Sequence, residues 1–215
     1  LPLSEPYTAV GYAHAMSGGE NTTPAVLSIT GNDAIVDWVV VELRHSAQPT
    51  LVVASACALV QRDGDVVDTD GVSPVEFLVG AGAYYVALRH RNHLAVMTSE
   101  TIPLGGSPTA IDFSDPLTPI HGTEAMRTID GVRTQWAGDI DQNGELKYTG
   151  STNDRDLILQ WIGGVVPTAT LPGYHNTDVN MDGITKYTGS MNDRDPILVN
   201  IGGIIPTNVR YGQVP

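Results

Sequence analysis

The chain has 215 residues, enough for one large domain or two small domains with hydrophobic cores. Its formal net charge of −13 at pH 7 argues against binding to nucleic acid or to anionic membrane surfaces. No apolar run approaches the roughly 18 residues of a membrane span, and a single cysteine, Cys57, leaves no intrachain disulfide. Because the chain opens at Leu1 without a methionine or a signal peptide, we interpret it as a processed mature form or an excised segment.

Residues 1–24 are predicted to form an extended, proline-bearing arm with apolar residues but no evident partner of its own. Such an arm can add as a strand to the open sheet edge of a neighbouring copy. That head-to-tail contact does not close, so it would build a filament. The alternative is that the arm folds back as the first strand of its own sheet. The run Asn21-Thr-Thr23 also satisfies the glycosylation sequon, which matters only if the source glycosylates its secreted proteins.

Residues 25–115 are predicted to form an antiparallel β-sandwich, because short Val-rich runs alternate with turn residues and no long helical period appears. The candidate strands are Ala25–Thr30, Ile35–Arg44, Leu51–Arg62, Val75–Val79, Ala83–Arg91, Leu94–Thr98 and Ala110–Phe113. Residues 116–136 are then a connector to the C-terminal part of the chain.

Three features of this region could suggest a binding site, and each has a simpler interpretation. His90 and His93 on one strand would point to opposite faces, which is poor geometry for a shared metal. The acids between Asp63 and Asp70 could hold a further calcium ion, but two Asp-rich turns explain them as well. Cys57 lies in an apolar run and is interpreted as an ordinary buried thiol.

Residues 137–215 contain the same pattern twice. Asp139-Ile-Asp-Gln-Asn-Gly-Glu145 returns as Asp178-Val-Asn-Met-Asp-Gly-Ile184, and Lys-Tyr-Thr-Gly-Ser follows both copies. Oxygen-bearing side chains at positions 1, 3 and 5, with glycine at position 6 for a turn of positive φ, are how a loop surrounds Ca²⁺. Position 7 contributes its backbone carbonyl, whatever its side chain. We therefore predict about two calcium ions, with loop ligands Asp139, Asp141, Asn143 and Glu145 in one copy and Asp178, Asn180, Asp182 and Ile184 in the other.

Each loop needs a further carboxylate to close it. Position 12 of an EF-hand loop, which would supply that carboxylate, is glycine in both copies. The next acids lie in an Asn-Asp-Arg-Asp run that opens a short predicted helix, where an acid also interacts favourably with the helix dipole. We favour Asp156 and Asp195 as closing ligands, with Asp154 and Asp193 as second ligands or helix caps.

Two calcium loops in tandem, each followed by a short helix, resemble the type I dockerin module of secreted bacterial proteins over roughly residues 137–205. The inserted Lys147-Tyr-Thr-Gly150 and its copy depart from the dockerin pattern. Other stretches are similar to the C-terminal regions of very large bacterial surface proteins: Ile35–Arg44, Gln61–Asp65, Tyr85–His93 and Trp136–Asp139. This resemblance implies secretion, an extracellular or cell-surface location and calcium binding, and it implies no activity.

No motif of a known catalytic class is present: there is no Gly-x-Ser-x-Gly, His-Glu-x-x-His, phosphate loop or dinucleotide fingerprint. We therefore expect a secreted, calcium-binding structural protein and not an enzyme. The preferred hypothesis is a subunit that self-associates into an extracellular fibre or surface assembly. The alternatives are a non-catalytic adhesive or carbohydrate-binding module, or a dockerin-type adaptor that binds a protein partner.

Overall fold

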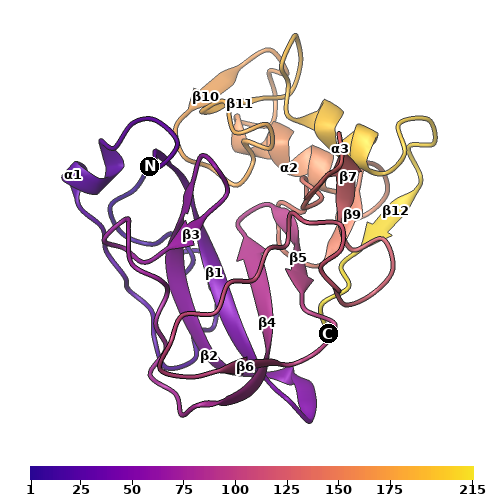
Figure 1. The fold of residues 1–215 in the computed structure, drawn as a ribbon. Helices are drawn as coiled ribbons and strands as arrows, with labels where there is room; N and C mark the ends of the chain where they lie inside the picture. Colours follow the sequence, from indigo (N-terminus) through magenta and orange to yellow (C-terminus); the bar gives the residue numbers. More distant parts are fainter.

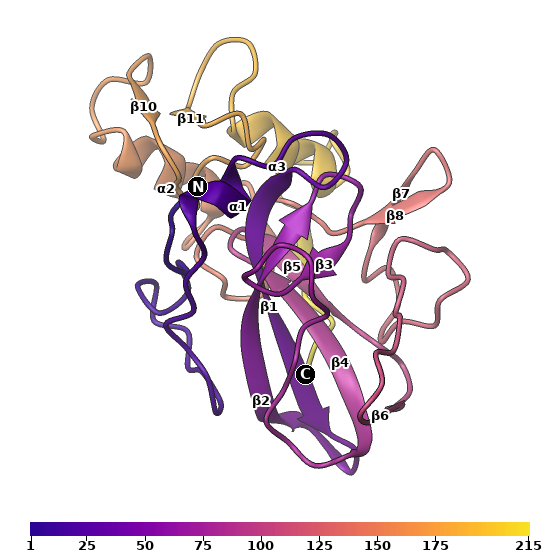
Figure 2. The same cartoon turned by 60° about the vertical axis from the view of Figure 1, so that its left-hand side comes forward.

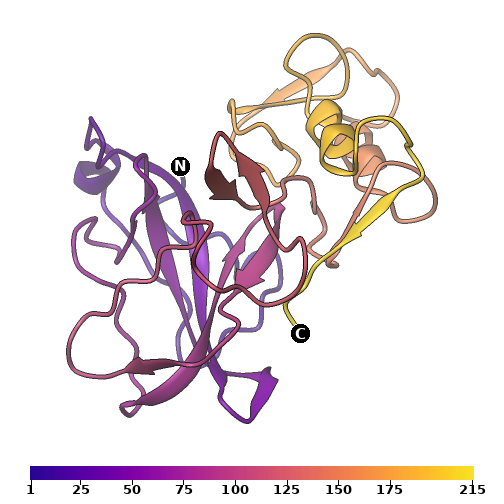
Figure 3. The ribbon, with the colours of Figure 1, turned by 45° about the vertical axis from the view of Figure 1, so that its right-hand side comes forward.

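All 215 residues are described by the computed structural model, which is mainly β with antiparallel sheets, as the sequence predicts. A large sheet and a smaller module with two helices lie side by side (Figure 1, Figure 3). The elements in chain order are α1 (Pro24–Leu27), β1 (Ile35–His45), β2 (Gln48–Gln61), β3 (Val66–Val67), β4 (Gly82–His90), β5 (His93–Met97), β6 (Ile102–Leu104), β7 (Arg127–Ile129), β8 (Val132–Thr134), β9 (Glu145–Lys147), α2 (Asp154–Trp161), β10 (Thr170–Pro172), β11 (Ile184–Lys186), α3 (Arg194–Asn200) and β12 (Val209–Tyr211). No helix is long and apolar enough to cross a membrane.

The large sheet has six strands in the order β3-β2-β1-β4-β5, with β6 paired to β4. The predicted sandwich is corrected here, because these strands form one sheet and irregular segments cover its two faces. The run predicted as a strand at 25–30 instead contains α1, whose first turn is capped by the Thr23 side chain, which accepts a hydrogen bond from the Val26 amide. The runs at 75–79 and 110–113 form no strands. Their apolar residues signal burial, and burial against a sheet does not require a strand.

One face of the large sheet carries the buried side chains Trp38, Val40, Cys57 and Leu59, which form a single cluster with Tyr7 of the N-terminal arm. Tyr7 is only 1% exposed, and its hydroxyl donates a hydrogen bond of 2.7 Å to the carbonyl oxygen of Trp38. In Figure 2 the arm runs along this side of the sheet. The arm therefore takes the place that a second sheet would occupy in a sandwich.

The arm, residues 1–24, packs on its own chain, but not as the first strand of its own sheet. It does not join the large sheet as a strand, since the bridge that it forms, from Ser4 to Asn21, lies within the arm. The Tyr12 hydroxyl donates to the buried carboxylate of Glu42 over 2.8 Å and fixes the middle of the arm. Donation of the arm to the sheet edge of a neighbouring copy stays a prediction.

The opposite face of the sheet is covered by loops. Leu43, Ala54 and Val86 form its buried cluster. Segments that precede β4 or follow β5 pack against this cluster through Phe77, Val79, Ile102, Leu104 and Ile111. Residues 105–125 pass along this side of the sheet, away from the arm (Figure 2).

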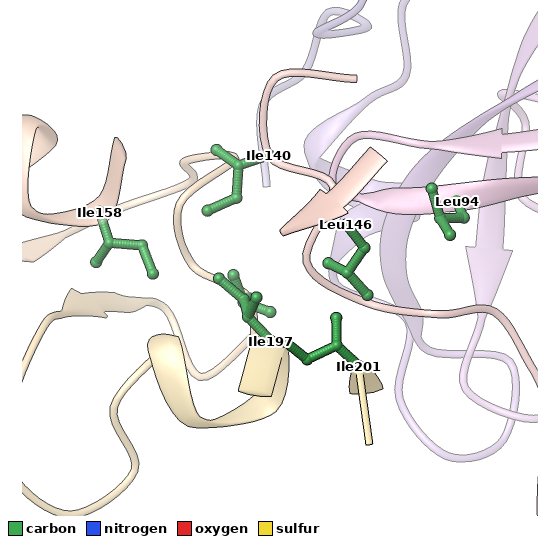
Figure 4. Packing of buried hydrophobic residues seen from close by; sticks show 7 residues of the cluster. Leu94, Ile140, Leu146, Ile158, Ile197 and Ile201 are labelled. Atoms are coloured by element: carbon green, nitrogen blue, oxygen red, sulfur yellow. The ribbon is translucent and has the colours of Figure 1, made fainter. Parts of the chain in front are cut away.

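In the C-terminal module, each repeat forms strand pairs with the other repeat. β9, in the first repeat, pairs with β12, which follows the helix of the second repeat. β11, in the second repeat, pairs with β10, which follows the helix of the first. The core between them consists of Leu94, Ile140, Leu146, Ile158, Val179, Ile197 and Ile201 (Figure 4). Because Leu94 belongs to β5 of the large sheet, the module shares its core with the N-terminal region.

Candidate metal centre

The two repeated loops, residues 139–145 (the first loop) and 178–184 (the second loop), have the same backbone conformation. Gly144 and Gly183 at position 6 have φ of 81° and 85°, the left-handed turn that the sequence predicts. The preceding turn is also shared, because Gln142 and Met181 at position 4 have φ of 58° and 59°. Non-glycine residues adopt this region at a cost. Its recurrence at equivalent positions indicates a conformation that the loop sequence determines.

In the first loop, three aspartates converge. One carboxylate oxygen from each of Asp139, Asp141 and Asp154 lies within 4.8 Å of the other two. Asp139 and Asp154 are 4% and 1% exposed, whereas Asp141 is exposed and forms the outer side of the group. The Oδ1 atom of Asp139 is buried and has no hydrogen-bond partner. A buried acceptor without a donor is rare and needs an explanation, and a cation at this point would supply one.

Asp154 is held at the loop by backbone amides. Its Oδ1 accepts a hydrogen bond from the Ile140 amide and its Oδ2 accepts one from the Lys147 amide, both at 2.8 Å. Asn153 is the N-cap of α2 and accepts from the Asp156 amide, so Asp154 becomes the first helical residue. The helix start therefore places one carboxylate against both ends of the first loop.

The second loop repeats this arrangement. Asp193 is 0% exposed, and it accepts hydrogen bonds from the amides of Val179 at 2.7 Å and Lys186 at 2.6 Å. Asp178 accepts from the Gly183 amide at 3.0 Å, as Asp139 does from the Gly144 amide at 3.2 Å in the first loop. Each repeat thus offers three aspartates and one asparagine: Asp139, Asp141, Asn143 and Asp154 in one, and Asp178, Asn180, Asp182 and Asp193 in the other.

The structure brings Asp154 and Asp193 to the loops, and not the acids that the sequence favoured as closing ligands, Asp156 and Asp195. Asp156 accepts a hydrogen bond of 2.9 Å from the Asn153 side chain and pairs with Arg155 on the surface. Asp195 likewise accepts from Asn192 at 2.8 Å, and its side chain is 62% exposed. Both residues brace the first turn of a helix and are not brought to the loops. The backbone carbonyls of Glu145 and Ile184 lie where the loops enter β9 and β11.

Burial gives the aspartates of the loops unusual acidities. It raises the pKa of Asp139 and of Asp154 to about 7, and hydrogen bonds from backbone amides offset only part of this effect. Burial likewise raises the pKa of Asp193 to about 6 and raises the pKa of Asp178. Neighbouring aspartates add to the shifts because like charges oppose ionisation. Such a group of acids is stabilised in its ionised form by a bound cation.

The inserted Lys-Tyr-Thr-Gly segments tie the two repeats together. The Thr149 hydroxyl donates to the carbonyl of Pro206, and the Thr188 hydroxyl donates to the carbonyl of Pro167, both over 2.8 Å. Each threonine therefore reaches the segment that follows the helix of the other repeat. Tyr148 and Tyr187 pack against the core of the module. The inserts have a structural role within the module, in agreement with their identity in the two copies.

The β4–β5 turn contacts both loops, a contact that was not predicted from the sequence. The Asn92 side-chain amide donates two hydrogen bonds of 2.8 Å, to the carbonyls of Asn176 and Asp178. The Gln142 side chain of the first loop donates to the Arg91 carbonyl at 3.1 Å. The polar residues at 90–93 could have suggested a structural turn, but the sequence does not say which segment the turn meets.

The expected geometry of the two histidines is wrong, because they do not share a strand. His90 ends β4 and His93 begins β5, so the turn brings their Nδ1 atoms to 2.7 Å. His90 also lies 3.0 Å from a carboxylate oxygen of Asp37. In the Asp63–Asp70 segment, Asp70 accepts hydrogen bonds from the Val72 and Ser73 amides. These bonds form an Asp-rich turn, the simpler of the two interpretations of this segment.

No family model, curated protein or solved structure matches the chain. The functional conclusion therefore rests on the geometry and chemistry of the site.

Proposed function

We propose that residues 137–215 bind two calcium ions, and that the protein is a non-catalytic, calcium-stabilised structural module of a secreted or cell-surface protein. The observation that carries the proposal is the convergence of Asp139, Asp141 and Asp154 within 4.8 Å. Two of these residues come from the beginning of the first loop, and the third comes from the start of the next helix. Such convergence of like charges is costly without a cation between them.

The donor set favours calcium among common metals. Aspartate and asparagine oxygens, with a backbone carbonyl at position 7, form the oxygen-only set that Ca²⁺ takes in flexible loops. Zinc and copper sites draw on histidine and cysteine, and neither residue type occurs within the two loops. The proposed side-chain ligands are Asp139, Asp141, Asn143 and Asp154 in the first site and Asp178, Asn180, Asp182 and Asp193 in the second.

The proposed ions would act as structural cross-links. Each would join a loop to the first turn of the helix that follows it, in a module whose core has 7 buried apolar residues. Small cores of this kind depend on metals or other cross-links for stability. A dockerin-like nature of the module remains part of this proposal, supported by the repeated order of loop and helix.

A role in an extracellular assembly is a second proposal with its own observation. Each helix is followed by two glycines and then two exposed apolar residues: Val165 and Val166 in one repeat, Ile204 and Ile205 in the other. Val165 is 83% exposed and Ile204 is 87% exposed. Two equivalent apolar tips on one module favour contacts with further copies or with a protein partner. The N-terminal arm, which packs on its own sheet, does not motivate assembly.

Thermal unfolding with and without calcium tests the first proposal. We expect calcium to raise the thermal midpoint of the parent chain, and Asp141→Ala combined with Asn180→Ala to remove most of this gain. The control is Asp63→Ala with Asp65→Ala, in an exposed turn far from the loops in sequence. Equal thermal midpoints of the parent chain with and without calcium would contradict the metal proposal.

Electron microscopy and sedimentation in calcium and in chelator test the assembly proposal. Fibres or oligomers in calcium, lost in Val165→Ser combined with Ile204→Ser, are the expected result. Dispersed monomers of the parent chain in calcium would reject self-association and leave the calcium proposal intact.

A further inference from the structure

A second group of potential metal ligands lies beneath the N-terminal arm, away from the two loops. Glu5 and His14 come from the arm, and Cys57 comes from the centre of β2. One ligand atom from each of the three residues lies within 4.8 Å of the other two. The His14 Nε2 atom is 3.8 Å from Glu5 Oε1, and the Cys57 Sγ atom is 3.7 Å from Glu5 Oε2.

Unpartnered polar atoms concentrate at this group. Four buried side-chain nitrogen or oxygen atoms of the chain lack a hydrogen-bond partner, and two of them are His14 Nδ1 and Glu20 Oε2. The His14 side chain is only 9% exposed. Glu20 and Cys57 line the same pocket. Burial raises the pKa of the Cys57 thiol, and the Glu20 and Glu5 carboxylates add to this shift. Each unpartnered buried group calls for a physical explanation.

The arm is folded so that these side chains converge. The Glu5 carboxylate accepts hydrogen bonds from the amides of Tyr7 at 2.6 Å and Gly19 at 3.2 Å, which closes the arm into a loop. Gly18 has a φ of +121°, and a Cβ atom there would lie 2.9 Å from the His14 ring. Glycine therefore leaves the space that the imidazole occupies. Backbone amides of the arm thus hold the Glu5 carboxylate in place.

We infer that Glu5, His14 and Cys57, with Glu20 as a fourth ligand, form a binding site for one divalent transition-metal ion of the zinc class. A thiolate, an imidazole and carboxylates are the donor types that Zn²⁺ and Co²⁺ take in four-coordinate sites. Calcium disfavours sulfur and nitrogen donors, so the site is chemically distinct from the two loops. Binding converts the Cys57 thiol to a thiolate and releases its proton to solvent.

The ion would fasten the arm to the sheet. Three of the four ligands lie in residues 5–20, and Cys57 lies on the face that the arm covers. A bound ion therefore links the arm to β2 beside the Tyr7 and Trp38 cluster. Cys57, which was interpreted from the sequence as an ordinary buried thiol, is a metal ligand in this proposal.

Cobalt spectroscopy of the full chain tests this inference directly. The chain is stripped of metal, saturated with calcium to fill the loops, and titrated with Co²⁺. Because Cys57 is the only cysteine, a thiolate-to-cobalt charge-transfer band can arise only from this site. We expect the band to saturate at one ion per chain and to disappear when Zn²⁺ displaces Co²⁺. Absence of the band from the folded chain overturns the inference.

Variants and measurements of thermal stability distinguish a site with several ligands from binding of the metal to the Cys57 thiol alone. His14→Ala, which retains the cysteine, should weaken Co²⁺ binding by at least about 10-fold, because loss of a direct ligand costs no less than loss of its supporting group. Zn²⁺ at about 100 times its Kd should raise the thermal midpoint of the parent by roughly 5–10 °C. Cys57→Ser should lose this rise, and Asp141→Ala with Asn180→Ala should keep it. An equal rise in parent and Cys57→Ser chains would contradict the site.

Discussion

Asp154 and Asp156 stand two residues apart at the start of α2, yet they have different surroundings. The Asp154 carboxylate is buried and accepts from two amides of the first loop, whereas Asp156 pairs with Arg155 at the surface. In an α-helix, residues two apart are separated by roughly 200° around the axis. The two side chains therefore cannot both face the loop, and the structure assigns the loop to Asp154.

We expect Asp154→Ala to abolish calcium binding at the first loop, with a loss in affinity of at least about 100-fold. It also removes the acceptor for the Ile140 and Lys147 amides, which costs about 1–3 kcal/mol for each unsatisfied buried group. The matched control, Asp156→Ala, should keep the affinity and cost up to about 1 kcal/mol through its lost contacts at the helix start. Calorimetric calcium titration of both variants checks this prediction, which fails if Asp156→Ala is the more damaging change.

The raised acidities predict how calcium stabilisation depends on pH. Asp139 and Asp154 have a folded-state pKa of about 7, above the ordinary value of about 3.9 for the unfolded chain. Without calcium, the folded chain holds protons that the unfolded chain releases, so these groups lower the free energy of unfolding as pH rises from about 4 to about 7. Calcium binds the ionised form, so the calcium-dependent gain in stability grows over the same range.

The measurement is the thermal midpoint with and without calcium at pH 5 and at pH 8, in metal-stripped buffers rather than a chelator. Groups remote from the loops contribute alike in both buffers and cancel in the difference. We expect the calcium-dependent increase in the midpoint to be larger at pH 8. The same increase at both pH values would show that the loop aspartates do not titrate in this range.

At the residue scale, the sequence predicts the conformation of the loops better than it predicts which acid of the following helix lies at each loop. Positions 1, 3 and 6 of each loop have fixed spacing, and the structure gives Gly144 and Gly183 the expected positive φ. The choice between Asp154 and Asp156 depends on where the helix begins. That boundary is set by Asn153 as the N-cap, and a sequence pattern does not locate a helix boundary to the exact residue.

At the scale of elements, the β4–β5 turn connects the large sheet to the second loop. The Asn92 side chain is fully buried and donates to the carbonyls of Asn176 and Asp178. Asp178 is position 1 of the second loop, so the turn fixes the point at which this loop begins. Stability of the sheet and calcium binding by the loop are therefore expected to be coupled.

We expect Asn92→Ala to lower the free energy of unfolding by about 2 kcal/mol, because it leaves buried carbonyls without their donors. It should weaken calcium binding at the second loop more than at the first. Asn32→Ala, in an exposed turn, is the control and should change neither quantity. Denaturant unfolding and calcium titration check the prediction. Equal weakening at both loops would contradict the proposed route through Asp178.

The element order was predictable and the pairing of elements was not. Val-rich runs between turn residues located β1, β2, β4 and β5 closely, and the acid-rich turns located α2 and α3. The pairings of β9 with β12 and of β10 with β11 join segments from different repeats. Three-residue strands carry too little pattern to identify partners so far along the chain. The segments that cover the large sheet also contain apolar residues, because they are buried against it. Their sequences therefore resembled strands of a sandwich.

At the scale of the whole molecule, the arm is part of the fold. Tyr7 is buried against Trp38, and Tyr12 reaches Glu42 in the middle of β1. Burial of a large aromatic side chain contributes roughly 1.5–3 kcal/mol. The arm is therefore expected to stabilise the sheet that it covers.

Removal of residues 1–12 should lower the thermal midpoint and expose the Trp38 side of the sheet to solvent. Removal of residues 1–3 alone, which spares Tyr7 and Glu5, should have a much smaller effect. Thermal unfolding with intrinsic tryptophan fluorescence measures both changes. A chain without residues 1–12 that melts like the parent would show that the arm does not support the sheet.

The central claim is that the chain binds two calcium ions through its repeated loops. Calorimetric titration of the metal-stripped chain at pH 8 tests this most directly. The account predicts two ions per chain for the parent and one ion per chain for Asp154→Ala. A parent chain that binds no calcium, or an Asp154→Ala chain that still binds two ions, would contradict it.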